Sequence, residues 1–379
     1  MTFNLVIPVY NRIHSIRRLM NSILKTPIRG NLDIYISCDG SSSSAVVDYV
    51  NSIQWRHGEY KVIQQSKQLG VDAHILACMK MAKDLGHVIL LEDDLVVSSS
   101  FQEYLLHAQK LIKQERNISG LSLYRYPILE SNHFPFELIP NNEFIYYMQR
   151  PSSKGCFYSW DMLEPYFKFL ETFDNDFESY HLPENVKKWS NEVWEKSFYC
   201  FLQHSGTYLA FPRYSLTSDF ADIGVHMKKQ TLKYVHQSKL YISKRFGDFN
   251  KLEETDNVYD SFYELIPRVV KKYNPELEVY DFEMDIYGNK TLSKISSEYL
   301  ISEKPTNIGL FGWERRLKPE INNLLFHQEG EFYQLAKTRS FRQKNRQEKL
   351  KENFLYYYPD TRIKDLIKMK WSEIISRFI

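Results

Sequence analysis

The chain of 379 residues carries 49 Lys and Arg against 47 Asp and Glu, so its formal net charge is only +2. This length excludes a single small module and suffices for one large α/β domain with an extension, or for two domains. Four scattered cysteines indicate reduced core residues rather than a disulfide framework or a zinc site. No apolar run approaches the roughly 20 residues of a membrane-spanning helix, and residues 1–8 lack the pattern of a signal peptide, so we expect a cytoplasmic protein.

Strand and helix patterns alternate through the first quarter of the chain. The predicted elements are a strand at 4–9, a helix at 13–25, a strand at 33–37, a helix at 45–53, a strand at 60–64 and a helix at 71–84. This alternation is typical of a parallel sheet with right-handed crossovers. We therefore predict an α/β fold with a Rossmann-like, mostly parallel central sheet flanked by helices.

The next predicted strand ends in three consecutive acids, Glu92, Asp93 and Asp94. The apolar run at 88–91 indicates a strand covered on both faces, where ionised carboxylates need a counter-charge. The loops at 8–12 and 39–44 should meet the acids at one sheet edge, because parallel strands open onto the ligand crevice at their carboxyl ends. A divalent cation that bridges the acids to a phosphorylated ligand would explain them, and a merely solvated acidic turn is the alternative.

The rest of the chain is less regular. Its predicted elements are a helix at 101–114, a strand at 118–124, an irregular segment at 126–142, helices at 162–173 and 192–204, a strand at 208–212 and a hairpin at 282–292. Around residue 234 the sequence becomes polar, Lys-rich and aromatic. We therefore predict one domain at 1–235 and an α-rich C-terminal extension at 236–379.

The C-terminal tail is basic, with twelve Lys or Arg and five Asp or Glu in residues 337–379. Its apolar residues recur at helical spacing and form one stripe: Ile363, Leu366, Ile367, Trp371, Ile374, Ile375 and Phe378. Such a helix suits the surface of an anionic membrane, and it also suits packing on its own protein or on a second subunit.

Three motifs together resemble nucleotide-sugar-dependent glycosyltransferases of the GT-A fold: LVIPVYNR at 5–12, SCDGS at 37–41 and LLEDDL at 90–95. They are similar to bacterial family 2 and to the N-acetylglucosaminyltransferase I group, whose metal motif is also Glu-Asp-Asp. The resemblance covers about the first 230 residues. It implies a GT-A catalytic domain at 1–235, with a nucleotide-sugar half at 1–125 and an acceptor half at 126–235.

The resemblance also implies roles for the residues of the crevice. Those expected around the nucleoside are Pro8, Tyr10, Arg12, Asp39 and Gly40. Glu92 and Asp93 would face the ribose or the donor sugar, and Asp94 would bind Mn²⁺ or Mg²⁺. His226 is the candidate for a second metal ligand, although a lone His is more often structural.

The expected catalytic base comes from the same resemblance. Glu192, in the aromatic-flanked segment 189–194, corresponds to the base that accepts the proton of the acceptor hydroxyl. A solvated helix start is the alternative for Glu192, and the nearby Glu195 competes with it. Asp161, which follows the aromatic segment 155–160, is the second candidate for the base.

The expected function is an inverting, metal-dependent transfer of a sugar from a nucleotide-sugar, expected to be a UDP-sugar, to a cell-surface glycan or lipid-linked oligosaccharide. A nucleotidyltransferase that acts on sugar phosphates is an alternative, but residues 8–12 lack the Gly and Lys of a phosphate loop. Acids interleaved with the basic residues of the tail disfavour nucleic-acid binding. A non-catalytic glycan-binding protein is the last alternative. The enzyme would work in the cytoplasm or on the inner face of the plasma membrane.

Overall fold

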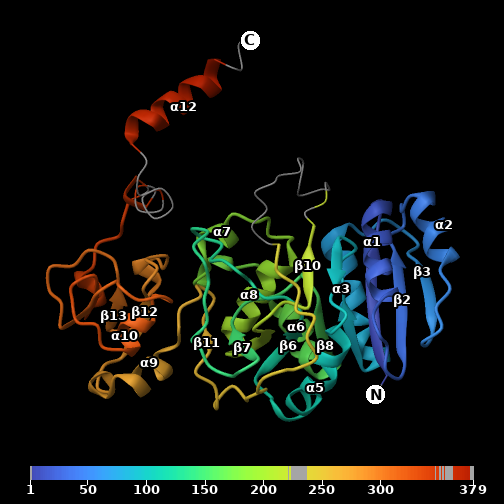
Figure 1. The fold of residues 1–379 in the computed structure, drawn as a ribbon, viewed down its shortest axis with the longest axis horizontal. Coiled ribbons are helices and arrows are strands. Elements are labelled where there is room, and N and C mark those ends of the chain that lie inside the picture. Colours follow the sequence, from blue (N-terminus) through green and yellow to red (C-terminus); the bar gives the residue numbers. More distant parts are fainter. Residues whose placement is uncertain are drawn as a thin grey trace.

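A nine-stranded mixed sheet forms the centre of the computed structural model, which describes residues 2–220, 222, 237–345, 347–349, 351, 354 and 362–375 (Figure 1). The strands follow the order β11-β7-β9-β6-β8-β4-β1-β2-β3. Their bounds are β1 Phe3–Val9, β2 Leu32–Cys38, β3 Tyr60–Gln64, β4 His87–Leu90, β6 Ile118–Ser122, β7 Ile145–Met148, β8 Cys156–Ser159, β9 Tyr208–Pro212 and β11 Val258–Tyr259. Strands β3, β2, β1 and β4 are parallel, and β8 runs antiparallel between β4 and β6. This mostly parallel α/β architecture confirms the predicted fold class.

Helices cover both faces of the sheet. Their bounds are α1 Ile13–Leu24, α2 Ser44–Ser52, α3 Val71–Lys80, α4 Ala82–Leu85, α5 Phe101–Gln114, α6 Trp160–Thr172, α7 Glu184–Lys187 and α8 Trp194–Ser205. One core joins α1, α2 and α5 to the sheet, and the other core joins α3, α4, α6 and α8. Successive side chains of β1 point to opposite faces, so Leu5 and Ile7 enter the first core and Val6 enters the second. All residues of β1 except Pro8 are therefore buried.

The carboxyl ends of β1, β2 and β4 meet at one edge of the sheet, as the alternation of elements predicts. The backbone N–H of Asp39, just after β2, donates to the carbonyl of Val9 at the end of β1 (3.0 Å). Strand β8 runs the other way, so its first residue pairs with Leu90 and its last residue, Ser159, pairs with His87. Lys154, just before β8, thus lies at the edge that carries the acids, whereas the residues that follow β8 lie at the opposite edge.

A small second sheet extends the acidic loop. Strands β5 (Leu95–Val97) and β10 (Thr217–Asp219) pair antiparallel, with Leu95 opposite Asp219. This pairing brings the segment after β9 next to the acids, although more than 100 positions separate them in the sequence.

The C-terminal part contains a four-stranded sheet of order β12-β13-β15-β14 beside short helices. Its elements are α9 Pro267–Tyr273, β12 Phe282–Asp285, β13 Tyr299–Ser302, β14 Phe311–Trp313, α10 Asn322–Leu325 and β15 Tyr333–Lys337. We call residues 267–345 the C-terminal module. The predicted hairpin at 282–292 is wrong: the chain does turn at Gly288, but β12 pairs in parallel with β13 instead of with the residues just after the turn. Strand β11 adds to the main sheet beyond residue 235, and the domain division stays a prediction.

The predicted tail helix is present as α12 (Ile363–Ile375), which projects away from the rest of the structure in Figure 1. Ile367 and Trp371 on this helix are 54% and 63% exposed. Within the described ranges, no helix has both the length and the apolar character needed to cross a bilayer.

Candidate active site

The loop after β2 is organised by the carboxylate of Asp39, which is 4% exposed. It accepts hydrogen bonds from the backbone N–H groups of Gly40 (2.8 Å), Leu69 (2.7 Å) and Gly70 (3.2 Å). A Cβ on Gly40 would lie 2.1 Å from the carbonyl carbon of Lys67, so only glycine fits at this approach. Asp39 therefore fixes two loops at the crevice through backbone contacts.

The loop after β1 contributes Tyr10 and Arg12 to the same edge. The Tyr10 hydroxyl accepts a hydrogen bond from Ser41 (3.4 Å), which joins the loops after β1 and β2. Tyr10 and Pro8 are both partly exposed at this edge. The structure therefore brings together Pro8, Tyr10, Asp39 and Gly40, as the resemblance implies.

Arg12 lies against the acids rather than standing free for a nucleoside. Its guanidinium donates to Asp94 (2.8 Å) and forms a second ion pair with Asp93. Burial disfavours the cation, but Asp93 and Asp94 outweigh it and raise the pKa of Arg12. Arg12 thus supplies the counter-charge that the buried acids require.

Asp93 and Asp94 are buried, whereas Glu92 is partly exposed, and Asp94 acts electrostatically on both neighbouring acids. Burial raises the pKa of Asp93 to about 6, although Arg12 acts in the opposite direction. Burial, followed by the nearby Asp94 carboxylate, raises the pKa of Glu92 to about 8. These carboxyl groups are therefore held in an environment that resists a third negative charge, so the alternative of a merely solvated acidic turn does not fit.

One carboxylate oxygen of the triplet has no partner. Asp94 Oδ1 is buried and accepts no hydrogen bond within the described residues. Such an oxygen is the kind of hard ligand that Mn²⁺ and Mg²⁺ prefer, and these ions take their remaining ligands from water and phosphate. The described part of the chain holds no cluster of three or more His, Cys, Asp or Glu that would bind a metal without such help. The donor set therefore fits a cation shared with a diphosphate.

The predicted second metal ligand, His226, lies outside the described residues. Asp222, in the same segment, accepts hydrogen bonds from Ser15 (2.5 Å) and pairs with Arg18 of α1. Burial alone would raise the pKa of Asp222, but the hydrogen bonds from Arg18 and Ser15 lower it. Arg18 also stacks on Phe220, with its guanidinium carbon 3.8 Å from the ring centroid. Phe220 and Asp222, just after β10, thus contact side chains of α1.

A cavity of about 490 Å³ opens beside Glu92, and we call it the acidic cavity. It is lined by Val71, Asp72, Ile75, Glu92, Tyr126, Glu130, Arg150, Ser153, Lys154, Trp189, Ser190, Val193, Trp194 and Glu195. Burial raises the pKa of Glu195, while the nearby Arg150 and Lys154 act to lower it. The cavity therefore places a second glutamate, with a raised pKa, in the same pocket as the first acid of the triplet.

Both cations that line the acidic cavity, Arg150 and Lys154, are paired with acids. Arg150 forms a two-pronged ion pair with Glu130 (2.6 and 2.8 Å) and also donates to the hydroxyls of Tyr199 (2.7 Å) and Tyr263 (2.9 Å). Lys154 pairs with the buried Asp219 of β10. These pairs hold Arg150 and Lys154 in place in the wall of the cavity.

The predicted bases do not reach this cavity. Glu192 is exposed in the loop before α8 and is absent from the cavity lining. Asp161 is exposed on the first turn of α6, at the sheet edge opposite the acids, because β8 runs antiparallel to β4. Glu195, on the first turn of α8, does line the cavity.

The comparison with protein families decides the class of the N-terminal part. Residues 4–162 match the model of glycosyl transferase family 2. Residues 4–162 are a family 2 glycosyltransferase domain. The matched stretch starts in β1 and ends in α6, so this glycosyltransferase domain contains the loops after β1 and β2 and the acidic triplet.

Solved structures of S. aureus TarS are also similar to the chain. The complex of TarS residues 1–349 with UDP-GlcNAc matches with a TM-score of 0.37 and 16% identity, covering 61% of this chain and 62% of that one. The structure of TarS 1–349 matches with a TM-score of 0.36 and 14% identity, covering 58% and 61%. The match thus spans less than two thirds of those proteins, and TM-scores below 0.5 support no inference about fold or function. No curated protein sequence matches the chain.

Sequence reasoning missed the cations of the acidic cavity and the position of Arg12. Arg150 lies among aromatic residues, and a cation in such a segment signals a buried ion pair, but its partner Glu130 is 20 positions away. The sequence offers Glu195 beside Glu192, and only the fold distinguishes their environments. The glycosyltransferase domain therefore carries the expected acids, with cationic partners that only the fold reveals.

Proposed function

We propose that this protein transfers a sugar from a UDP-sugar to a hydroxyl of a cell-surface glycan or lipid-linked oligosaccharide, with inversion at the anomeric carbon. The observation that carries the proposal is the buried, unpartnered Oδ1 of Asp94, at the edge where the loops of Tyr10 and Asp39 meet. UDP is the donor nucleotide that the family resemblance favours.

On the donor side, Asp94 would hold Mn²⁺ or Mg²⁺, and His226 stays the candidate for a second ligand. The cation, when bound, neutralises the charge that develops on the departing diphosphate. Arg12 keeps the neighbouring carboxylates paired through its contacts with Asp93 and Asp94, which holds Asp94 in position. Asp39 positions the nucleoside loops through its backbone contacts.

On the acceptor side, we assign the catalytic base to Glu195 in place of Glu192 and Asp161. Glu195 accepts the proton of the acceptor hydroxyl as that oxygen bonds to the anomeric carbon and the nucleoside diphosphate leaves. A general base works best when its pKa lies near the working pH, and burial moves the pKa of Glu195 in that direction. Burial and the Asp94 carboxylate raise the pKa of Glu92, which favours the protonated carboxyl that can donate a hydrogen bond to the donor sugar.

The proposed location is the cytoplasm at the inner face of the plasma membrane. The basic residues and the exposed Ile367 and Trp371 of the tail support it, because they match the two contacts that hold a helix on an anionic bilayer. A lipid-linked acceptor would be found at the same surface.

A donor panel tests the proposal directly. UDP-, GDP- and TDP-sugars are tested with and without Mn²⁺ for thermal stabilisation and for hydrolysis of the donor. We expect a UDP-sugar to stabilise and to be hydrolysed only with the metal. Stabilisation by no nucleotide-sugar, with or without metal, would disprove the proposal.

A further inference from the structure

A second cavity of about 800 Å³ lies between the N-terminal part of the chain and the C-terminal module, and we call it the junction cavity. Asn132 and Asn185 line it from one side, and Tyr287, Asn289 and Tyr333 line it from the module. Its volume falls within the range of about 300–1,000 Å³ typical of small-ligand sites.

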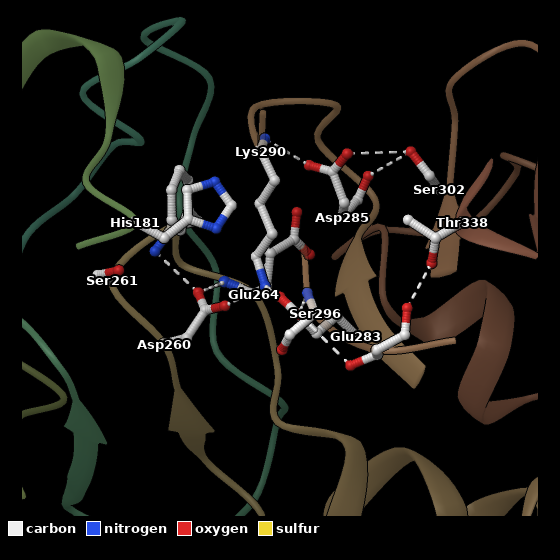
Figure 2. A network of polar contacts seen from close by, with 12 residues as sticks. His181, Asp260, Ser261, Glu264, Glu283, Asp285, Lys290, Ser296, Ser302 and Thr338 are labelled. Atoms are coloured by element: carbon white, nitrogen blue, oxygen red, sulfur yellow. Dashed lines mark hydrogen bonds and ion pairs between the residues drawn. The ribbon is translucent and has the colours of Figure 1, made fainter. Parts of the chain in front are cut away.

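The wall of the junction cavity is fixed by buried polar contacts, which Figure 2 shows. Lys290, 4% exposed, pairs with Asp260 (2.7 Å) outside the module and with Glu283 (3.0 Å) inside it. The next residue, Thr291, donates its backbone N–H to His181 Nε2 (3.1 Å). Both contacts bind the turn at 287–291 to the rest of the chain, so the cavity is preformed.

Glu264 also holds this turn, because its Oε1 accepts a hydrogen bond from the backbone N–H of Tyr287 (2.9 Å). Gly288 has φ +63°, a conformation that favours glycine, and a Cβ there would lie 2.7 Å from Glu303 Oε1. The side chains of the turn therefore have fixed positions before any ligand binds.

The lining combines flat rings, amides and paired charges. Its rings come from Phe134, Phe262, Tyr287 and Tyr333, and its amides from Asn132, Asn185, Asn289 and Gln343. The lining carries four cations, Lys188, Arg315, Lys344 and Lys349, and three carboxylates, Glu184, Glu303 and Glu320. Lys344 pairs with Glu303 (3.0 Å) and Arg315 lies 3.7 Å from Glu320, so the formal charge of the lining is close to balance. Asn289 Nδ2 is buried and has no hydrogen-bond partner among the described residues.

This chemistry fits a neutral saccharide. Sugar rings offer apolar C–H faces to aromatic rings and hydroxyls to amides, and a buried amide donor without a partner costs free energy that a ligand hydroxyl would recover. A lining whose formal charges nearly cancel favours a neutral, polyhydroxylated ligand over a polyphosphate.

The junction cavity adjoins the acidic cavity. Glu130 lines the acidic cavity, and Asn185, which lines the junction cavity, donates to Glu130 Oε2 (3.1 Å). Ser131, the next residue after Glu130, also lines the junction cavity. One hydrogen-bonded pair of side chains thus separates the two sites.

We infer that the junction cavity binds sugar units of the acceptor glycan that are remote from the reacting hydroxyl, an inference that rests on the proposed function. Binding of remote units supplies free energy that positions the reacting hydroxyl in the acidic cavity. The acceptor is then an oligosaccharide rather than a monosaccharide or a simple alcohol.

Saturation-transfer NMR on the full chain tests this inference. The probes are neutral tri- and tetrasaccharides of glucose, galactose and N-acetylglucosamine at millimolar concentration, with their uronic-acid counterparts as charged probes. We expect a saturation-transfer signal on at least one neutral probe. The signal should fall at least fivefold in Asn289→Ala and, separately, in Asn132→Ala. Asn51→Ala, the same change on exposed α2, is the matched control and should bind like wild type.

The outcomes separate this inference from the proposed function. The inference is overturned if no neutral probe shows a saturation-transfer signal, if only charged probes show one, or if the signal is equal in all variants. Displacement of the saccharide by UDP also overturns it. Metal-dependent stabilisation by UDP, measured on the same samples, reports on the nucleotide crevice. If the saccharide still binds but UDP does not, the proposed function fails while the junction site stands as a saccharide site.

Discussion

The two glutamates near the start of α8 differ sharply in environment, although three positions separate them. Glu192 is exposed in the preceding loop, and Glu195 points into the acidic cavity with a raised pKa. The backbone N–H of Trp194 donates to Asp72 (3.0 Å), which anchors the start of the helix and sets the direction of Glu195. This anchoring makes Glu195 the only one of the two that can meet an acceptor in the cavity.

We therefore expect Glu195→Gln to lower kcat by about 10²–10⁴-fold, the usual contribution of a general base. The amide keeps the size of the side chain, so metal-dependent stabilisation by the donor should persist. Initial rates with a saturating donor measure the effect. Glu192→Gln is the matched control, and a comparable loss of rate in this control would return the role to Glu192.

Asp94→Asn should abolish the stabilisation that Mn²⁺ and a UDP-sugar give together, because the amide loses the charge that holds the cation. Donor hydrolysis should fall at least about 10²-fold, as expected when a major electrostatic contact is lost from the transition state. Thermal unfolding with and without metal measures the first effect.

Asp161→Asn provides the matched control for this change, since Asp161 is exposed at the opposite sheet edge. It should behave like wild type in both assays. Metal-dependent donor binding that survives in Asp94→Asn would remove Asp94 from the metal site.

At the scale of single residues, the positions of the site's acids can be predicted from the sequence better than the positions of the side chains that pair with them. Asp39 and Asp94 follow predicted strands, so chain order alone brought them to one edge. The pairing of Arg12 with the acids depends on a side-chain direction across about 80 positions, and the choice of Glu195 depends on where α8 begins. Neither of these features has a signal in the local pattern.

At the scale of elements, the end of β4 stores electrostatic free energy. Burial and Asp94 raise the pKa of Glu92 to about 8, whereas the pKa of an unfolded glutamate is about 4.3. Between these values the folded protein keeps a proton that the unfolded chain releases. The free energy of unfolding should therefore fall as the pH rises from about 4.5 to about 8.

Glu92→Gln removes this titration without changing the size of the side chain. Urea unfolding at about pH 5 and about pH 8 should show a smaller loss of stability between the two pH values in the variant than in wild type. Glu192→Gln, at an exposed site, should keep the wild-type difference. An unchanged difference in Glu92→Gln would show that the carboxyl of Glu92 titrates normally.

Elements with local signals were predicted well, and elements defined by distant partners were not. Helix α5 and strands β3 and β9 have the predicted bounds because their apolar spacing is regular. Strands β7 and β8 and the β5–β10 pair are short and gain their pairing from residues far along the chain. The same cause explains the module, where the turn at Gly288 suggested a hairpin although β12 pairs with β13.

At the scale of the whole molecule, different parts of the chain form the sheet edge, the two cavities and the tail. The loops after β1 and β2 come from the first 100 residues, the acidic cavity adds residues up to 195, and the junction cavity also needs the module. An acceptor that reaches both cavities would lie across the junction between the N-terminal part and the module. Basic charge is concentrated beyond residue 336, away from these acids.

This charge distribution leads to a prediction about membranes. The full chain should bind vesicles that contain anionic phosphatidylglycerol and should bind neutral phosphatidylcholine vesicles much more weakly, with added salt reducing the binding. Replacing exposed Ile367 and Trp371 together by Ala should weaken binding by at least about tenfold, since each apolar side chain contributes on the order of 1.5–3 kcal/mol when buried. Vesicle sedimentation measures both effects.

Ile308→Ala, at a side chain that is 68% exposed on the module, is the control for loss of exposed apolar surface and should bind vesicles like wild type. Sedimentation velocity without vesicles separates the alternative of self-association. If the chain forms dimers that the Ile367 and Trp371 changes dissociate, and vesicle binding is unaffected, these two exposed side chains contact a second subunit. In that case the basic tail no longer supports a position at the membrane, and a lipid-linked acceptor loses the argument that favours it over a soluble glycan.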